Sequence, residues 1–71
     1  MMSKKSLCNT LSSYTCILNP EKVADTIEEA LKEKGYDLNH LLSCFVYNRE
    51  DEIEISLLTS PNLDIKIKLT K

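Results

Sequence analysis

The sequence contains no tryptophan, one glycine and two prolines, and its aromatic side chains are limited to three tyrosines and one phenylalanine. Phosphate-binding loops and dinucleotide-binding fingerprints need several glycines, so both are excluded. No run approaches the ~20 apolar residues that span a bilayer. Because aromatics are scarce, Ile and Leu must form most of the core, and a chain this short buries only ~60% of its unfolded surface. We therefore expect one small domain of marginal stability.

The cysteines are few and widely spaced. Cys8, Cys16 and Cys44 are an odd number, whereas a secreted disulfide scaffold needs an even and denser set. The start of the chain has the lysines of a signal peptide, but polar residues interrupt any apolar stretch after them. We therefore expect a cytoplasmic protein with reduced thiols.

The last third of the chain alternates between apolar and polar residues with period two, as two half-buried strands do. The apolar positions are Ile53, Ile55 and Leu57, then Leu63, Ile65, Ile67 and Leu69. Ser60-Pro61-Asn62 separates the two runs with turn-forming residues. The pattern predicts a β-hairpin in which the residue numbers of each pair add up to 120 or 122. An odd sum would place the apolar side chains of one strand on the solvent face.

The clearest helix signal covers residues 20–34. Asn19 is a good N-cap, Pro20 suits the first helical position, and Gly35 suits the left-handed residue after a helix. Val23, Ile27, Ala30 and Leu31 form one apolar face. Residues 14–18 are rich in strand formers and predict a first strand. Residues 36–48 fit either a helix or a strand, and we predict one helical turn near 38–42 followed by a strand at 43–48.

These elements predict an α+β fold. One helix packs on a three- to four-stranded antiparallel meander in the order β-α-β-β-β. Residues 1–12 are polar and are expected to form a flexible N-terminal arm, and residues 13–71 a single α+β domain.

His40 and Cys44 are the residues that could carry chemistry. On a helix, their spacing would direct both at one metal ion, and Cys8 and Cys16 could complete a zinc site. On a strand the two would lie ~13 Å apart. A thiol–imidazole pair would also need an orienting group and an oxyanion pocket. An isolated cysteine is usually a small buried hydrophobe. We therefore expect no metal, cofactor or catalytic residue, and a protein that is not an enzyme.

The charged residues suggest an interaction surface instead. The net charge of −2 and the pI of about 5.3 do not favour nucleic acid. We expect a regulator or inhibitor that binds another protein, of the kind that small phage or mobile-element reading frames encode. Its expected contact residues are an acidic set with two flanking lysines: Glu28, Glu29, Glu33, Glu50, Asp51, Glu52, Glu54, Lys66 and Lys68. The alternative is a nucleic-acid-associated accessory protein that uses Lys4, Lys5, Arg49, Lys66, Lys68 and Lys71.

A homodimer is the expected assembly. One helix over a small sheet covers a single face, and a second copy would cover what remains, through a sheet edge or through residues such as Leu41, Cys44 or Val46.

The stretch Ala30-Leu31-Lys32-Glu33-Lys34-Gly35-Tyr36-Asp37, followed by Leu41-Leu42, resembles part of the small IreB-type regulators of low-GC Gram-positive bacteria. That family is all-helical, whereas residues 52–69 alternate as strands, and its Gly-Asp-Pro turn is missing here. The resemblance therefore assigns no function and no site residue to this chain.

Overall fold

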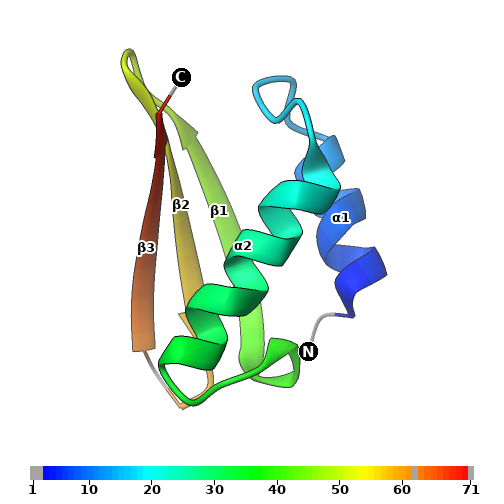
Figure 1. The fold of residues 1–71 in the computed structure, drawn as a ribbon, viewed down its shortest axis with the longest axis vertical. Helices are drawn as coiled ribbons and strands as arrows, with labels where there is room; N and C mark the ends of the chain where they lie inside the picture. The colour runs from blue at the N-terminus through cyan, green and yellow to red at the C-terminus, as the bar shows by residue number, and fades with distance from the viewer. Residues whose placement is uncertain (1–2, 62, 71) are drawn as a thin grey trace.

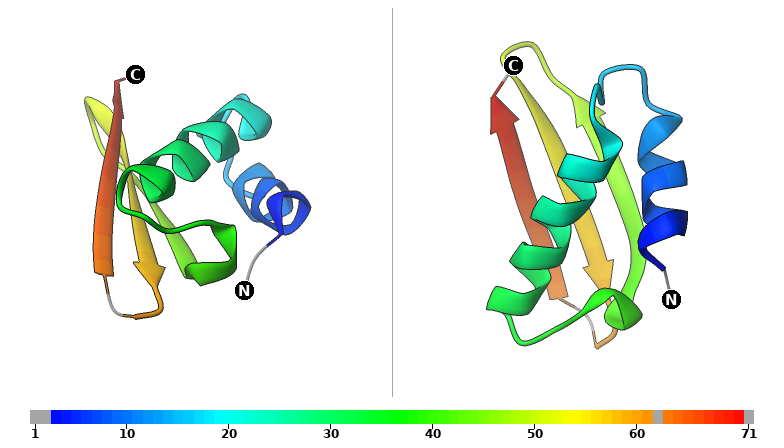
Figure 2. Two further views of the ribbon diagram at one scale, coloured as in Figure 1. Left: turned by 60° about the horizontal axis from the view of Figure 1, so that its bottom comes forward. Right: turned by 45° about the vertical axis from the view of Figure 1, so that its right-hand side comes forward.

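The computed structural model describes residues 3–61 and 63–70. Its elements are α1 (Lys4–Ser12), α2 (Pro20–Glu33), the 3-10 turn η1 (Leu38–His40), β1 (Leu41–Asn48), β2 (Glu52–Thr59) and β3 (Leu63–Thr70). The strands form an antiparallel meander in the order β1-β2-β3, and both helices lie on one face of it (Figures 1 and 2). The fold is a small α+β domain as predicted, but its topology is α-α-β-β-β and not β-α-β-β-β.

Helix α1 replaces the flexible arm predicted over residues 1–12, which is wrong for residues 4–12. The hydroxyl oxygen of Ser3 caps the helix by accepting a hydrogen bond from the backbone N–H of Ser6 at 3.1 Å. Leu7 and Leu11 lie one turn apart and are fully buried, and α1 packs against α2. Since both leucines belong to the same hydrophobic cluster as the sheet residues, α1 is part of the folded core. Residues 1 and 2 lie outside the described residues.

The strand predicted at residues 14–18 is also wrong. This segment is a turn between the helices, in which the N–H of Tyr14 donates to the carbonyl of Leu11 and the N–H of Ile17 to the carbonyl of Tyr14. Ile17 is buried although it pairs with no strand. Local strand propensity is therefore overridden by the packing of Ile17 into the core.

Helix α2 follows the prediction closely. The Asn19 side chain accepts a hydrogen bond from the N–H of Lys22 at 3.2 Å, and Pro20 occupies the first turn. At the other end Gly35 has a φ of +82°, and the N–H of Tyr36 donates to the carbonyl of Leu31 at 2.8 Å, as in a Schellman motif. The helix buries Ala24, Ile27 and Leu31 against the sheet side of the molecule, while Val23 and Ala30 are half-buried.

Strand β1 contains a bulge that explains why its sequence was ambiguous. The pairing with β2 runs regularly from Ser43↔Leu58 to Asn48↔Ile53 but shifts between Leu41 and Ser43. Leu41 and Cys44 are both buried although they are three residues apart, which a regular strand does not allow. The extra residue of the bulge, Leu42, restores the alternation. The predicted helical turn near 38–42 is η1, and the predicted strand at 43–48 is part of β1.

The predicted hairpin of β2 and β3 is confirmed with its register. Ile53 pairs with Leu69, Ile55 with Ile67 and Leu57 with Ile65, so paired positions sum to 122. Ser60 and Pro61 follow β2 in the connection to β3, and residue 62 lies outside the described residues. One face of the hairpin is buried beneath the helices, as the period-two pattern requires. The sheet also departs from the all-helical fold of the IreB-type regulators.

Candidate functional site

The candidate site is the face of the sheet that the helices do not cover. Four large apolar side chains are exposed on β1 and the facing end of β2: Leu42 (46%), Phe45 (48%), Tyr47 (46%) and Leu58 (39%). We call these four residues the apolar stripe. Phe45 and Tyr47 alternate with the buried Cys44 and the half-buried Val46, which places both aromatic rings on the uncovered face.

The strand register holds the stripe together. Ser43 pairs with Leu58 and Phe45 with Ser56, so Leu58 lies diagonal to Phe45 across the β1–β2 ladder. Diagonal neighbours on one face of a sheet are within reach of large side chains. Phe45, Tyr47 and Leu58 therefore share one face, and Leu42 is exposed at the bulge next to Ser43.

Charged side chains occupy the rest of the uncovered face. Strand β2 contributes Glu52 and Glu54, and β3 contributes Asp64, Lys66 and Lys68. We call these five residues the charged strip. Glu54 pairs in register with Lys68, as the 122 register requires, but its carboxylate contacts Arg49 at 3.5 Å. Lys68 instead lies 3.8 Å from Glu52, and the hydroxyl of Ser56 donates to Asp64 at 3.2 Å.

Arg49 joins the two parts of this face. Its guanidinium lies 5.6 Å from the centroid of the Tyr47 ring and also contacts Glu54. A cation over an aromatic face is favourable by ~0.5–1 kcal/mol at an exposed site. The side of Tyr47 toward the charged strip is thus partly covered by Arg49, whereas Phe45 has no such neighbour among the contacts of the described residues.

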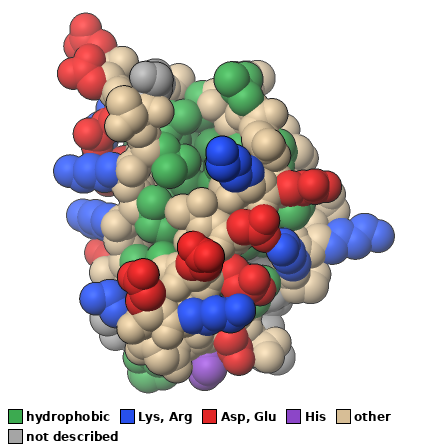
Figure 3. Space-filling view, viewed as in Figure 1, with side chains coloured by type: hydrophobic (Ala, Val, Ile, Leu, Met, Phe, Trp, Pro, Cys, Tyr) green, Lys and Arg blue, Asp and Glu red, His purple; other side chains and the backbone are tan. Residues whose placement is uncertain are grey.

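The structure does not bring the predicted acidic set together. Glu52, Glu54, Lys66 and Lys68 share the uncovered face. The remaining acids lie elsewhere: Glu28, Glu29 and Glu33 are on α2, and Glu50 and Asp51 are in the turn between β1 and β2. Figure 3 looks onto the helical side of the molecule, where acidic side chains lie among lysines instead of forming one acidic surface.

The lysines of the nucleic-acid alternative are separated in the same way. Lys4 and Lys5 belong to α1, on the helical side, and Lys66 and Lys68 to the opposite face. Lys4 forms an ion pair with Asp25, and the hydrogen bond that the Lys4 ammonium donates to that carboxylate raises the pKa of Lys4. Lys71 lies outside the described residues.

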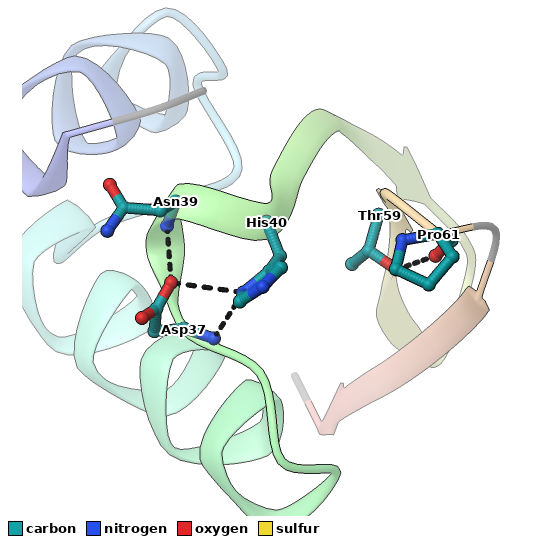
Figure 4. A network of polar contacts seen from close by, with 5 residues as sticks. All are labelled: Asp37, Asn39, His40, Thr59 and Pro61. Carbon is teal, nitrogen blue, oxygen red and sulfur yellow. Dashed lines mark hydrogen bonds and ion pairs between the residues drawn. The ribbon is translucent and has the colours of Figure 1, made fainter.

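His40 has a structural role at the start of β1 (Figure 4). Its Nδ1 lies 3.2 Å from the backbone N of Asp37 and 3.1 Å from the Asp37 carboxylate. One nitrogen cannot accept the first hydrogen bond and donate the second at once, and in the cap Nδ1 accepts from the N–H of Asp37. The Asp37 carboxylate also accepts from the N–H of Asn39 at 2.8 Å. These contacts cap η1.

The three cysteines are free thiols. Cys44 is buried in the core, and burial raises its pKa from 9.0 to about 11, which disfavours the thiolate that a nucleophile or a zinc ligand requires. Cys8 and Cys16 are half-buried against the core. Within residues 3–61 and 63–70, no three His, Cys, Asp or Glu side chains gather closely enough to hold a metal ion.

A pocket of about 510 Å³ opens where the turn before α2 meets the ends of β2 and β3. Seven residues line it: Cys16, Ile17, Leu18, Val23, Ile53, Leu69 and Thr70. Hydrophobic side chains gather in the corresponding upper part of Figure 3. The lining has no charged residue, and Cys16 and Thr70 supply its polar side-chain atoms. It lacks the convergent polar groups that orient a substrate.

The structure corrects the prediction that Leu41, Cys44 and Val46 need cover from a second copy. Leu41 is fully buried, Cys44 is 6% exposed, and Val46 packs against the core, because the bulge turns this side of β1 toward the helices. On the sheet, the large apolar residues that do lack cover are those of the apolar stripe, and Leu18 in the turn between the helices is exposed separately. Their signal in the sequence is the alternation of Phe45 and Tyr47 with Cys44 and Val46.

No protein-family model matches this chain, and neither the curated proteins nor the solved structures contain a match to it. In the part of the chain that the structure describes, neither helix has the length and apolar character needed to cross a membrane.

Proposed function

We propose that this chain is a small non-enzymatic protein-interaction module that binds another protein through the uncovered face of its sheet. The observation that carries this proposal is the apolar stripe, in which the exposed Phe45, Tyr47 and Leu58 share one face and Leu42 is exposed at the bulge. Contiguous exposed apolar side chains with a polar rim mark protein-binding surfaces, whereas scattered ones need no explanation. The proposed role is that of a regulator or inhibitor, which acts by occupying a surface of its partner, and the apolar stripe supports such binding.

The chemistry of the face defines the partner. Arg49, Lys66 and Lys68 carry three positive charges, and Glu52, Glu54 and Asp64 carry three negative ones, so the face is neutral overall. The partner is therefore a protein surface with apolar or aromatic groups for the stripe and charges of both signs for the rim. Exposed rim pairs contribute little affinity and mainly select the partner.

Single-stranded nucleic acid is the second candidate, because exposed aromatics on an open sheet beside Lys and Arg can stack bases. Phe45 and Tyr47 supply the rings and Arg49 the nearest cation. Against it, three acids on the same face cancel the positive charge that attracts a phosphate backbone. A salt-dependent mobility shift with mixed single-stranded DNA or RNA would favour this candidate over protein binding.

A thiol enzyme or a zinc module built on Cys44 and His40 is the weakest candidate. The Cys44 thiol is buried and the His40 ring caps η1. The cytoplasm is the proposed compartment, since three free thiols suit a reducing environment.

The test is a quantitative capture from the native cell with Phe45→Lys and a matched control. Asn9→Lys adds the same charge at an exposed position of α1, on the helical side. We expect a protein that the wild type and Asn9→Lys capture equally and that Phe45→Lys recovers at least tenfold less. If Phe45→Lys captures the same proteins in the same amounts, the uncovered face is not the binding surface.

A further inference from the structure

Charge is distributed unevenly over the uncovered face. Strand β1, from Leu41 to Asn48, contains no charged residue, whereas β2 presents Glu52 and Glu54, and β3 presents Lys66 and Lys68. The rows that cross the sheet repeat this order: Tyr47 pairs with Glu54, which pairs with Lys68. The face therefore runs from neutral and aromatic at β1 to acidic at β2 and to mixed charge at β3, where Asp64 accompanies the two lysines.

From this order we infer that a second copy of this chain covers the apolar stripe, with a two-fold axis that passes through β1. The inference shares its surface with the proposed function and deepens it by naming a partner. A two-fold axis brings each patch against the same patch of the other copy, so a suitable patch must tolerate itself. The stripe meets this condition, because its four side chains are uncharged and the neighbouring Arg49 is paired with Glu54.

The other two strands do not meet this condition. An axis through β2 would bring Glu52 and Glu54 against their own copies, and an axis through β3 would do the same with Lys66 and Lys68. With the axis through β1, each β3 lies two strand spacings from it, so the two lysine rows are ~19 Å apart. That distance exceeds the Debye length of ~8 Å at physiological salt, and the rows are screened from each other.

Strand β1 also has free backbone groups. It is an edge strand whose only hydrogen-bonded neighbour among the described strands is β2. Edge strands are usually protected by charges or by bulges. The bulge of β1 lies at its start, between Leu41 and Ser43, and leaves the regular part from Ser43 to Asn48 without such protection.

The size of the face sets the expected affinity. Three eight-residue strands make a face of roughly 26 Å by 14 Å from standard strand dimensions. An axis through β1 covers only the part of this face around β1, so the area buried per partner is well below the ~800 Å² of a standard stable interface. We therefore expect a dimer that dissociates at micromolar concentrations.

The experiment is light scattering coupled to size exclusion over a dilution series of the purified chain. We expect twice the 8.1 kDa of the chain at high micromolar concentration and the monomer mass after dilution. Phe45→Lys and Phe45→Glu should each remain monomeric at the highest concentration, because like charges would meet near the axis. An equimolar mixture of the two variants should recover the dimer mass, since opposite charges then face each other.

Asn9→Glu is the matched control, because Asn9 is exposed on α1, on the helical side of the molecule and away from the uncovered face. It should leave the dimer mass unchanged, and circular dichroism should show all variants folded. A wild-type mass of 8.1 kDa at high micromolar concentration overturns the inference. So does a dimer that Phe45→Lys leaves intact, or a mixture that stays monomeric. These measurements contain no other protein, so their failure is distinct from a failure of the capture experiment.

Discussion

Replacing Leu11 by Ala tests whether α1 is part of the core or an arm that rests on it. Leu11 is fully buried and belongs to the central hydrophobic cluster. Buried Leu→Ala substitutions cost ~2–5 kcal/mol, because the removed atoms lose their burial and leave a cavity. At ~0.05–0.15 kcal/mol per residue, the 71 residues have a total stability of about 4–11 kcal/mol. The substitution therefore removes a large part of the free energy of unfolding.

Thermal unfolding followed by circular dichroism gives the measurement. At about 4–8 °C per kcal/mol for a domain of this size, the melting temperature should fall by at least about 8 °C. Asn9→Ala is the control, since Asn9 lies on the exposed side of the same helix, and it should melt close to the wild type. If Leu11→Ala melts within a degree or two of Asn9→Ala, the packing of α1 is wrong and residues 4–12 behave as the flexible arm.

Two further predictions concern Gly35 and Cys44. Gly35→Ala should lose about 1–2 kcal/mol in urea unfolding, because a Cβ there meets no atom but the φ of +82° is unfavourable for Ala. An unchanged urea midpoint would contradict the left-handed cap. Cys44 should react with iodoacetamide at pH 8 more slowly than Cys8 and Cys16, as peptide mass spectrometry can show, since burial keeps its thiol protonated. The pKa of Cys44 is 9.0 in the unfolded chain and about 11 in the folded one. Between pH 9 and about 11 unfolding therefore releases a proton, and the free energy of unfolding should fall as the pH rises through this range. Equal reaction rates at the three thiols would contradict this burial.

The elements that the sequence predicts well are those whose local signals agree with their tertiary environment. Helix α2 has a cap, a first-turn proline and a terminal glycine that all reappear as contacts in the structure. The β2–β3 register follows from the period of two, because only an even sum of paired positions buries both apolar sets. In both cases local propensity and burial select the same conformation.

Helix α1 and the turn that follows it show the opposite case. A nine-residue helix is too short to be stable alone, so its formation depends on the packing of Leu7 and Leu11. Ser3 is a suitable cap in the sequence, but without a longer apolar pattern it does not distinguish a helix from a polar terminus. Residues 14–18 have strand propensity, and Ile17 is nevertheless buried from a turn. Contacts between distant segments decide both conformations, and a local pattern does not contain them.

The candidate site was only partly predictable for a related reason. The predicted interaction surface was chosen by charge. It contained all residues of the charged strip except Asp64, but also acids on α2, on the other side of the molecule. The apolar stripe depends on knowing which face each β1 residue occupies, and the bulge at Leu42 breaks the period that would reveal it. Once Cys44 is placed in the core, Phe45 and Tyr47 must point away from it, and no helix covers that side. Strand β1 therefore has an apolar core face and an apolar outer face and no charged residue, and the outer face is the one through which we propose that this chain binds.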